Sequence, residues 1–213
     1  MEDVLRVSQW PYDRRHPVVW MDEASNQWMG EGNAPWPLHA GRVPCQDDAY
    51  ARQGGWHQCR WGEPLRGWRH VRGTAHRTKR AWAAGIRAWI DGPSPQATSM
   101  RLVLDNLHTH TGASVSAAFP PPEARRLLDR LAIHPTPQHA RWLNLAEIAR
   151  GVLHGPGLDR RMDNTDGLRS AMSAWEARRN KHQGTIHWRF PIAVARNKLK
   201  KLSPVVANSH RPM

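Results

Sequence analysis

Short apolar runs that end in acidic residues define two candidate strands. Residues 102–104 (Leu-Val-Leu) lead into Asp105, and residues 17–21 (Pro-Val-Val-Trp-Met) lead into Asp22. A short apolar run bounded by polar residues is typical of a strand buried on both faces. In open α/β sheets, ligands bind outside the carboxyl ends of the strands. The pattern therefore predicts a shared acidic site at Asp22 and Asp105.

Helical periodicity marks several further segments. In residues 77–90 the apolar positions Trp82, Ile86 and Trp89 recur at helical spacing. In residues 141–154, Asn144 and Glu147 stand three positions apart and so share one face of the predicted helix. Further helices are predicted at residues 112–119, 124–131, 165–182 and 193–202.

The remaining strands and loops are less regular. Strands are predicted at residues 67–74 and 132–134. Residues 53–61 occupy the position of another strand, which a turn at residues 64–67 would join to residues 67–74 in a hairpin. The polar side chains of Gln58 and Arg60 would reduce the apolar surface that a core strand there could bury. Residues 30–48 are rich in Gly and Pro, which favours a long irregular loop.

The order of elements is typical of a ribonuclease H-like fold. We expect an α/β architecture, a single domain at residues 17–203 with a mixed sheet flanked by helices. A basic lead-in at residues 1–16, with at most a helical turn, and a flexible tail at residues 204–213 would flank it. Carboxylates suit Mg²⁺, because this hard cation prefers oxygen ligands. Two such ions roughly 3.5–4 Å apart can assist an in-line phosphoryl displacement.

The positive charge indicates a polyanionic partner. The chain has 31 Lys and Arg against 18 Asp and Glu, a formal charge of +13, spread along its length. Neutralising phosphates releases counterions, which favours nucleic-acid binding, although a basic surface without a special role is the alternative. Charge alone gives no sequence specificity. The candidate contacts are Arg77, Lys79 and Arg80, where a predicted helix begins, and Arg141.

Several classes of protein are disfavoured. Cys45 and Cys59 do not form a disulfide scaffold, and together with His57 they match no familiar zinc spacing. No apolar run approaches the ~20 residues that cross a bilayer, so no membrane partner is expected. The first residues lack the layout of a signal peptide. A cytoplasmic setting is the expectation.

Five motifs resemble those of one protein family. They are MDEASNQW around Asp22, PLRGWRHVRGTAHRTK at residues 64–79, LDNLHTHT around Asp105, HARWLNLAE ending at Glu147, and WEARRN at residues 175–180. In this order they resemble the DDE-superfamily catalytic domain of bacterial mariner-like insertion-sequence transposases. The resemblance covers residues 14–204, nearly all of the chain.

The resemblance implies a catalytic triad of Asp22, Asp105 and Glu147 that binds two Mg²⁺ or Mn²⁺ ions. It implies hydrolysis of DNA at transposon ends and transfer of the freed strand to target DNA, by a homodimer in a synaptic complex within the bacterial nucleoid. Glu23 and Asn106 would neighbour the ligands, and His108, His110 and Asn144 would line the site. Alternatively, the two histidines form a hydrogen-bonded loop pair and Asn144 packs on its own helix.

Two departures from the family stand out. Relatives carry helix-turn-helix modules ahead of the catalytic domain, so an N-terminally truncated copy is expected here. Relatives also have an apolar strand where this chain has residues 53–61, and unpartnered buried polar groups would weaken the hairpin. The alternative function is therefore an inactive remnant that binds DNA non-specifically. A regulator with a helix-turn-helix at residues 125–147 is a third reading, which Pro135 and Pro137 disfavour.

Overall fold

A five-stranded mixed sheet organises the molecule. The computed structural model describes residues 1–31, 50–74, 76–107, 109–137, 143–144 and 165–198, with the backbone alone at 26–31 and 50–56. The strands are β1 (Val18–Glu31), β2 (Tyr50–Glu63), β3 (Trp68–Thr74), β4 (Met100–Leu104) and β5 (Leu131–Pro135). Their order is β3-β2-β1-β4-β5. The first three strands pair antiparallel, and β1, β4 and β5 pair parallel.

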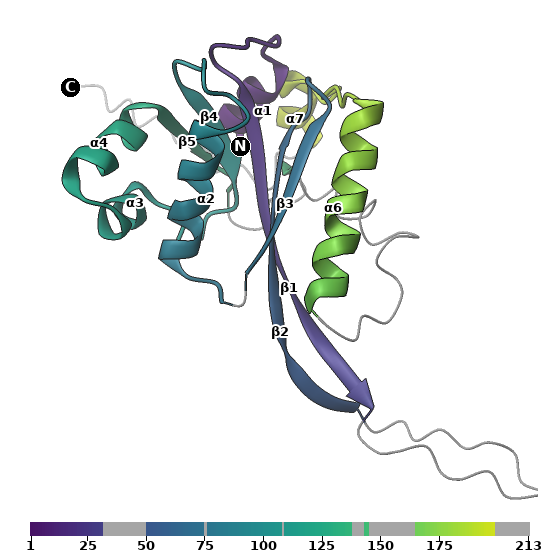
Figure 1. Cartoon of the computed structure of the whole chain (residues 1–213). Coiled ribbons are helices and arrows are strands. Elements are labelled where there is room, and N and C mark those ends of the chain that lie inside the picture. Colours follow the sequence, from purple (N-terminus) through teal and green to yellow (C-terminus); the bar gives the residue numbers. More distant parts are fainter. Residues whose placement is uncertain (32–49, 75, 108, 138–142, 145–164, 199–213) are drawn as a thin grey trace, which may run out of the picture.

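Helices cover both faces of this sheet. They are α1 (Glu2–Gln9), α2 (Lys79–Asp91), α3 (Gly112–Ala118), α4 (Pro121–Asp129), α6 (Thr165–His182) and α7 (Ile192–Lys198). Figure 1 shows α2, α3 and α4 on one side of the sheet and α6 along the other. The predicted ribonuclease H-like architecture is confirmed. Within the described parts of the chain, no helix has the length and apolarity needed to cross a bilayer.

Alternation along the central strands produces two cores. Val19 and Leu102, both fully buried, face the α2 side together with Trp82. The intervening Trp20 and Val103 point to the opposite face. Each strand is thus buried on both faces, which explains the continuous apolar runs at residues 18–21 of β1 and 102–104 of β4.

Tryptophan packing joins β2 to α2. Trp61 stacks on Trp89, with 5.7 Å between ring centroids and 24° between planes, and Trp68 meets Trp89 edge-on at 4.7 Å. Gly85 in the middle of α2 permits this approach, because a Cβ there would lie 3.0 Å from the Trp61 ring. The helix begins at Thr78, whose hydroxyl accepts from the Ala81 amide at 3.1 Å.

Residues 2–9 form a helix that packs on the sheet, where only a helical turn was expected. In α1, Val4, Leu5 and Val7 are at most 1% exposed and pack in the second core with Trp20. The run is short and carries acidic and basic residues, so its three apolar positions gave little signal in the sequence. The N-terminal segment therefore contributes to the same core as the central strands.

Several boundaries differ from the predictions. β1 and β2 are each 14 residues long and pair with one another well beyond their other neighbours. Cross-strand backbone hydrogen bonds hold this ribbon, so hydrophobic patterning did not reveal it. Gly30, assigned to a loop, lies in β1, whereas residues 32–49 fall outside the described chain. α4 begins at Pro121, and β5 follows it directly within the sheet, which contradicts a helix-turn-helix at this point.

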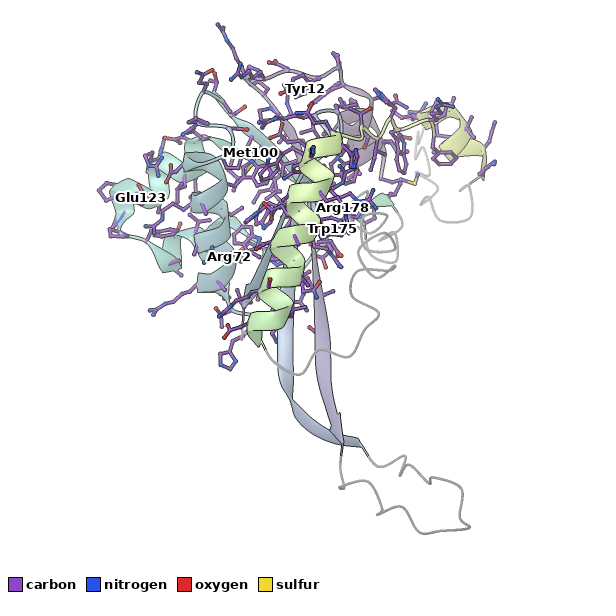
Figure 2. All side chains as sticks on the ribbon, turned by 45° about the vertical axis from the view of Figure 1, so that its right-hand side comes forward. Tyr12, Arg72, Met100, Glu123, Trp175 and Arg178 are labelled. Carbon is purple, nitrogen blue, oxygen red and sulfur yellow. The ribbon has the colours of Figure 1, made fainter. Side chains whose placement is uncertain are left out.

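Polar side chains of α6 hold the outer strand of the hairpin. The Asn180 amide donates to the Arg69 carbonyl at 2.8 Å and accepts from the Arg69 amide at 2.8 Å. Glu176 accepts from the Val71 amide at 3.2 Å. The WEARRN segment thereby docks on β3, and Trp175, visible on α6 in Figure 2, is 4% exposed.

Asn180→Ala is expected to lower the free energy of unfolding by about 1–2 kcal/mol, because it leaves both backbone groups of Arg69 without partners. Urea denaturation of the variant measures this change. Ser173→Ala, at an exposed position of the same helix, is the control and should stay within about 0.5 kcal/mol of wild type. Equal stabilities of the two variants would contradict the assignment.

Candidate active site

Two buried acidic residues lie level with each other on neighbouring central strands, one within β1 and one just beyond the end of β4. The parallel register pairs Val18 with Arg101 and Trp20 with Val103. Two further residues along each strand bring Asp22 level with Asp105, on neighbouring strands that lie roughly 4.8 Å apart. Both residues are buried, at 3% and 6% exposure. The two residues predicted to share a site are therefore neighbours in the sheet. Asp105 directly follows the end of β4, as predicted, whereas Asp22 lies inside β1, which continues to Glu31.

Asp22 forms a buried ion pair with Arg60. These residues face each other across β1 and β2, and an Arg60 guanidinium N–H donates to the Asp22 Oδ2. Arg60 is 2% exposed. Its neighbours along the strand, Cys59 and Trp61, point to the α2 side. The polar residue that was expected to weaken β2 is thus charge-paired in the structure.

His110 connects Asp105 with Glu23. Its Nδ1 lies 3.0 Å from the Asp105 Oδ1, and its Nε2 lies 3.3 Å from the Glu23 Oε2. Trp82 stacks on the ring at 5.4 Å between centroids. Burial favours the neutral imidazole, but the two carboxylates outweigh that effect and raise the pKa of His110. A protonated ring carries a hydrogen on each nitrogen, and donation from its Nδ1 holds the Asp105 carboxylate in one orientation.

Asn144 is anchored beside the first acidic residue. Its Nδ2 donates to the Met21 carbonyl at 2.8 Å, and Leu143 is buried in the second core. The chain therefore passes next to Asp22 three residues before Glu147. Glu147 itself, His108, Arg141 and most of the predicted helix at 141–154 lie outside the described residues. Asn106 is described and exposed.

The candidate DNA contacts at the start of α2 and just before it have different surroundings. The Arg77 Nε–H donates to the Glu23 Oε2 at 2.6 Å. Burial alone would raise the pKa of Glu23, but His110 and Arg77 together outweigh burial and lower this pKa. Lys79 and Arg80 are exposed in a first helical turn that contains no acidic residue. These two cations are the better placed to meet a phosphate from solution.

Glu63, on β2, is a further buried acid. Its Oε1 accepts from Arg66 at 3.2 Å and from the Ser94 hydroxyl at 3.1 Å. Burial raises the pKa of Glu63, although Arg66 and Ser94 oppose that rise. Because the folded pKa exceeds the unfolded one, ionising Glu63 destabilises the folded state.

Glu63→Gln should therefore become more stable relative to wild type as pH rises from 4.5 through the raised pKa. Thermal melts between roughly pH 4 and 8 test this sign. Glu123→Gln is a control of opposite sign, because a hydrogen bond with Arg126 lowers the pKa of Glu123. Its stability relative to wild type should rise as pH falls. Parallel pH profiles for both variants would contradict the prediction.

The donor set suits a hard cation, with one condition. Asp22 and Asp105 offer carboxylate oxygens, but Arg60 and His110 already contact one oxygen of each. Among the described residues, no group of three or more His, Cys, Asp or Glu side chains is arranged to hold a metal ion. A third ligand would have to come from beyond them, where Glu147 lies.

Sequence reasoning did not identify Arg60 as part of the site. The register between β1 and β2 places it opposite Asp22, but residues 32–49 separate these strands and no pattern in them fixes that register. The only signal was a basic residue at an inward position of a strand.

Comparisons with known proteins concern the family and the fold of this chain. Residues 17–169 match the family described as DDE superfamily endonuclease. The fold is similar to the Mos1 strand transfer complex (TM-score 0.54, 13% identity, 86% of this chain and 58% of that chain). It is also similar to the Mos1 mariner paired end complex with Mn (TM-score 0.55, 12% identity, 86% and 56%). The chain thus spans less than two thirds of these chains, and no curated protein matches its sequence.

Proposed function

The chain belongs to the DDE superfamily endonuclease family, and from this premise we propose that it is the catalytic domain of a bacterial mariner-like insertion-sequence transposase. Its reaction would be hydrolysis of a DNA phosphodiester at a transposon end, followed by strand transfer into target DNA. The parallel pairing of β1 with β4, which brings Asp22 level with Asp105, is the observation that most supports this proposal.

Asp22, Asp105 and Glu147 would hold two divalent cations, Mg²⁺ or Mn²⁺. Bound there, such cations would polarise the scissile phosphate and favour ionisation of the attacking hydroxyl. His110 would orient the Asp105 carboxylate through its 3.0 Å contact. Asn144, bonded to the Met21 carbonyl, would fix the chain that leads to Glu147. Glu23 would keep His110 protonated through their ion pair.

DNA is the proposed partner. The formal charge of +13 suits a polyanion, and Lys79 and Arg80 supply exposed cations near the site. Two of the similar solved structures are a strand transfer complex and a paired end complex. By this likeness the domain would act on transposon ends and target as a homodimer in a synaptic complex.

A plasmid-nicking assay tests the proposal. Purified protein is expected to nick supercoiled DNA in the presence of Mn²⁺ or Mg²⁺ and to stop when EDTA removes the metal. No nicking is expected when Ca²⁺ is the only divalent cation present, so Ca²⁺ serves as the control cation. Absence of nicking with both Mn²⁺ and Mg²⁺ would overturn the proposed activity.

A second candidate function is an inactive remnant that binds DNA through its basic surface. The buried pair between Arg60 and Asp22 favours it, because a proposed metal ligand is already neutralised. In that case the same protein would bind DNA without nicking it. The binding would weaken steeply as salt is raised and would be indifferent to metal.

A further inference from the structure

Arg60 is an unusual residue to find in the core of a hairpin. Its side chain is 3% exposed, and its charge partner among the described residues is Asp22, itself 4% exposed. The Nε and one terminal nitrogen of Arg60 have no hydrogen-bond acceptor within the described chain. A buried guanidinium is costly unless it is paired. The Asp22 carboxylate therefore has a structural task besides any role in catalysis.

The backbone fixes this contact. Asp22 and Arg60 are direct cross-strand partners in the β1–β2 register, and opposite residues of an antiparallel pair have Cβ atoms about 4.5–5.5 Å apart. Neighbouring pairs such as Met21 with Trp61 anchor the register on the other face. The guanidinium is therefore held at the carboxylate by the sheet itself.

A guanidinium and a divalent cation would compete for the carboxylate oxygens of Asp22. With Arg60 on Oδ2, Asp22 has less negative charge to offer a metal, and a metal bound there would face a buried like charge at close range. Removing the charge of Arg60 would relieve both effects. The expected consequence is a metal site with weakened affinity in the resting protein.

We propose that Arg60 is a resident cation that occupies Asp22 and competes with the divalent metal for it. The inference rests on the proposed function, because it takes Asp22 as a metal ligand. Arg60 acts through Asp22 and is a positioning residue. Its release would be a required step before the carboxylate becomes available to a metal.

A small cavity lies next to the Arg60 side chain. Arg60 lines a cavity of ≈ 30 Å³, and Trp20, Trp68 and Trp175 also line it. Aromatic faces can stabilise a desolvated cation, so the proposal places the guanidinium against these rings once it leaves Asp22. The cavity lies between the hairpin and α6, which carries Trp175 (Figure 2).

Mn²⁺ binding to the full chain without DNA tests the inference. Electron paramagnetic resonance of free Mn²⁺ gives the dissociation constant for wild type and for Arg60→Met. The variant is expected to bind Mn²⁺ at least about tenfold more tightly. The gain should vanish in Asp22→Asn/Arg60→Met. Equal Mn²⁺ affinity of wild type and Arg60→Met would overturn the role of Arg60 and leave the proposed function intact.

Further variants separate the remaining outcomes. If neither wild type nor Arg60→Met binds Mn²⁺, the proposed metal site fails and the inference fails with it. If circular dichroism shows that Arg60→Met does not fold, Arg60→Gln keeps a donor for Asp22 without the charge and should show the same tightening of Mn²⁺ binding.

Arg66→Met is the control, because Arg66 lies in the same hairpin but pairs with Glu63. Its loss should leave the Mn²⁺ affinity within about twofold of wild type. Equal tightening in Arg66→Met would overturn the inference.

Discussion

Asp105→Asn is expected to lower metal-dependent nicking by at least about a thousandfold, because losing a charged metal ligand removes several kcal/mol of transition-state stabilisation. The amide oxygen of the introduced Asn can still accept a hydrogen bond from His110, as the Asp105 carboxylate does at 3.0 Å. The fold should therefore survive. Rates of plasmid nicking measure the first effect, and thermal melts measure the second.

Asp166→Asn is the matched control for Asp105. Asp166 is an exposed carboxylate on α6 that pairs with Arg169 at 3.1 Å, outside the candidate site. Its variant should nick DNA at the wild-type rate. If Asp105→Asn nicks within about tenfold of wild type, Asp105 does not hold a catalytic metal.

Asp22→Ala is expected to lower the free energy of unfolding by about 3–5 kcal/mol, because it leaves the buried charge of Arg60 without its partner. Urea denaturation at neutral pH measures the change. The double variant Asp22→Ala/Arg60→Met should recover most of the loss, since it removes both charges and keeps an apolar side chain of similar length.

An exposed ion pair provides the comparison. Asp91→Ala breaks the surface contact with Arg126, at 2.8 Å, and should cost no more than about 1 kcal/mol. If Asp22→Ala costs as little, or if the double variant is no more stable than Asp22→Ala, the buried pair does not support the hairpin.

Much of the sheet was predictable because its central strands are buried on both faces. The apolar runs before Asp22 and Asp105 predicted both strands, and the predicted end of β4 at Asp105 is confirmed. The predicted end of β1 at Asp22 is wrong, because β1 continues to Glu31. The helix at Thr165–His182 has the predicted bounds. The Pro64–Gly67 turn predicted the β2–β3 hairpin, which the structure confirms. The catalytic roles of the three acids stay predictions.

Contacts between segments distant in the sequence were not predictable from periodicity. Arg60 meets Asp22 across 38 positions, and the Asn180 amide reaches the Arg69 backbone across 111. Each depends on a register or a docking angle that local pattern does not encode. The resemblance identified His110 as a site residue. Its position between Asp105 and Glu23 became visible only in the three-dimensional structure.

The amide of Asn180 substitutes for a neighbouring strand. β3 is the outermost strand on its side of the sheet, and such an edge exposes backbone groups that can recruit a strand from another molecule. By engaging both backbone groups of Arg69, α6 closes part of that edge. Detachment of α6 would expose these backbone groups as a template for intermolecular β-pairing.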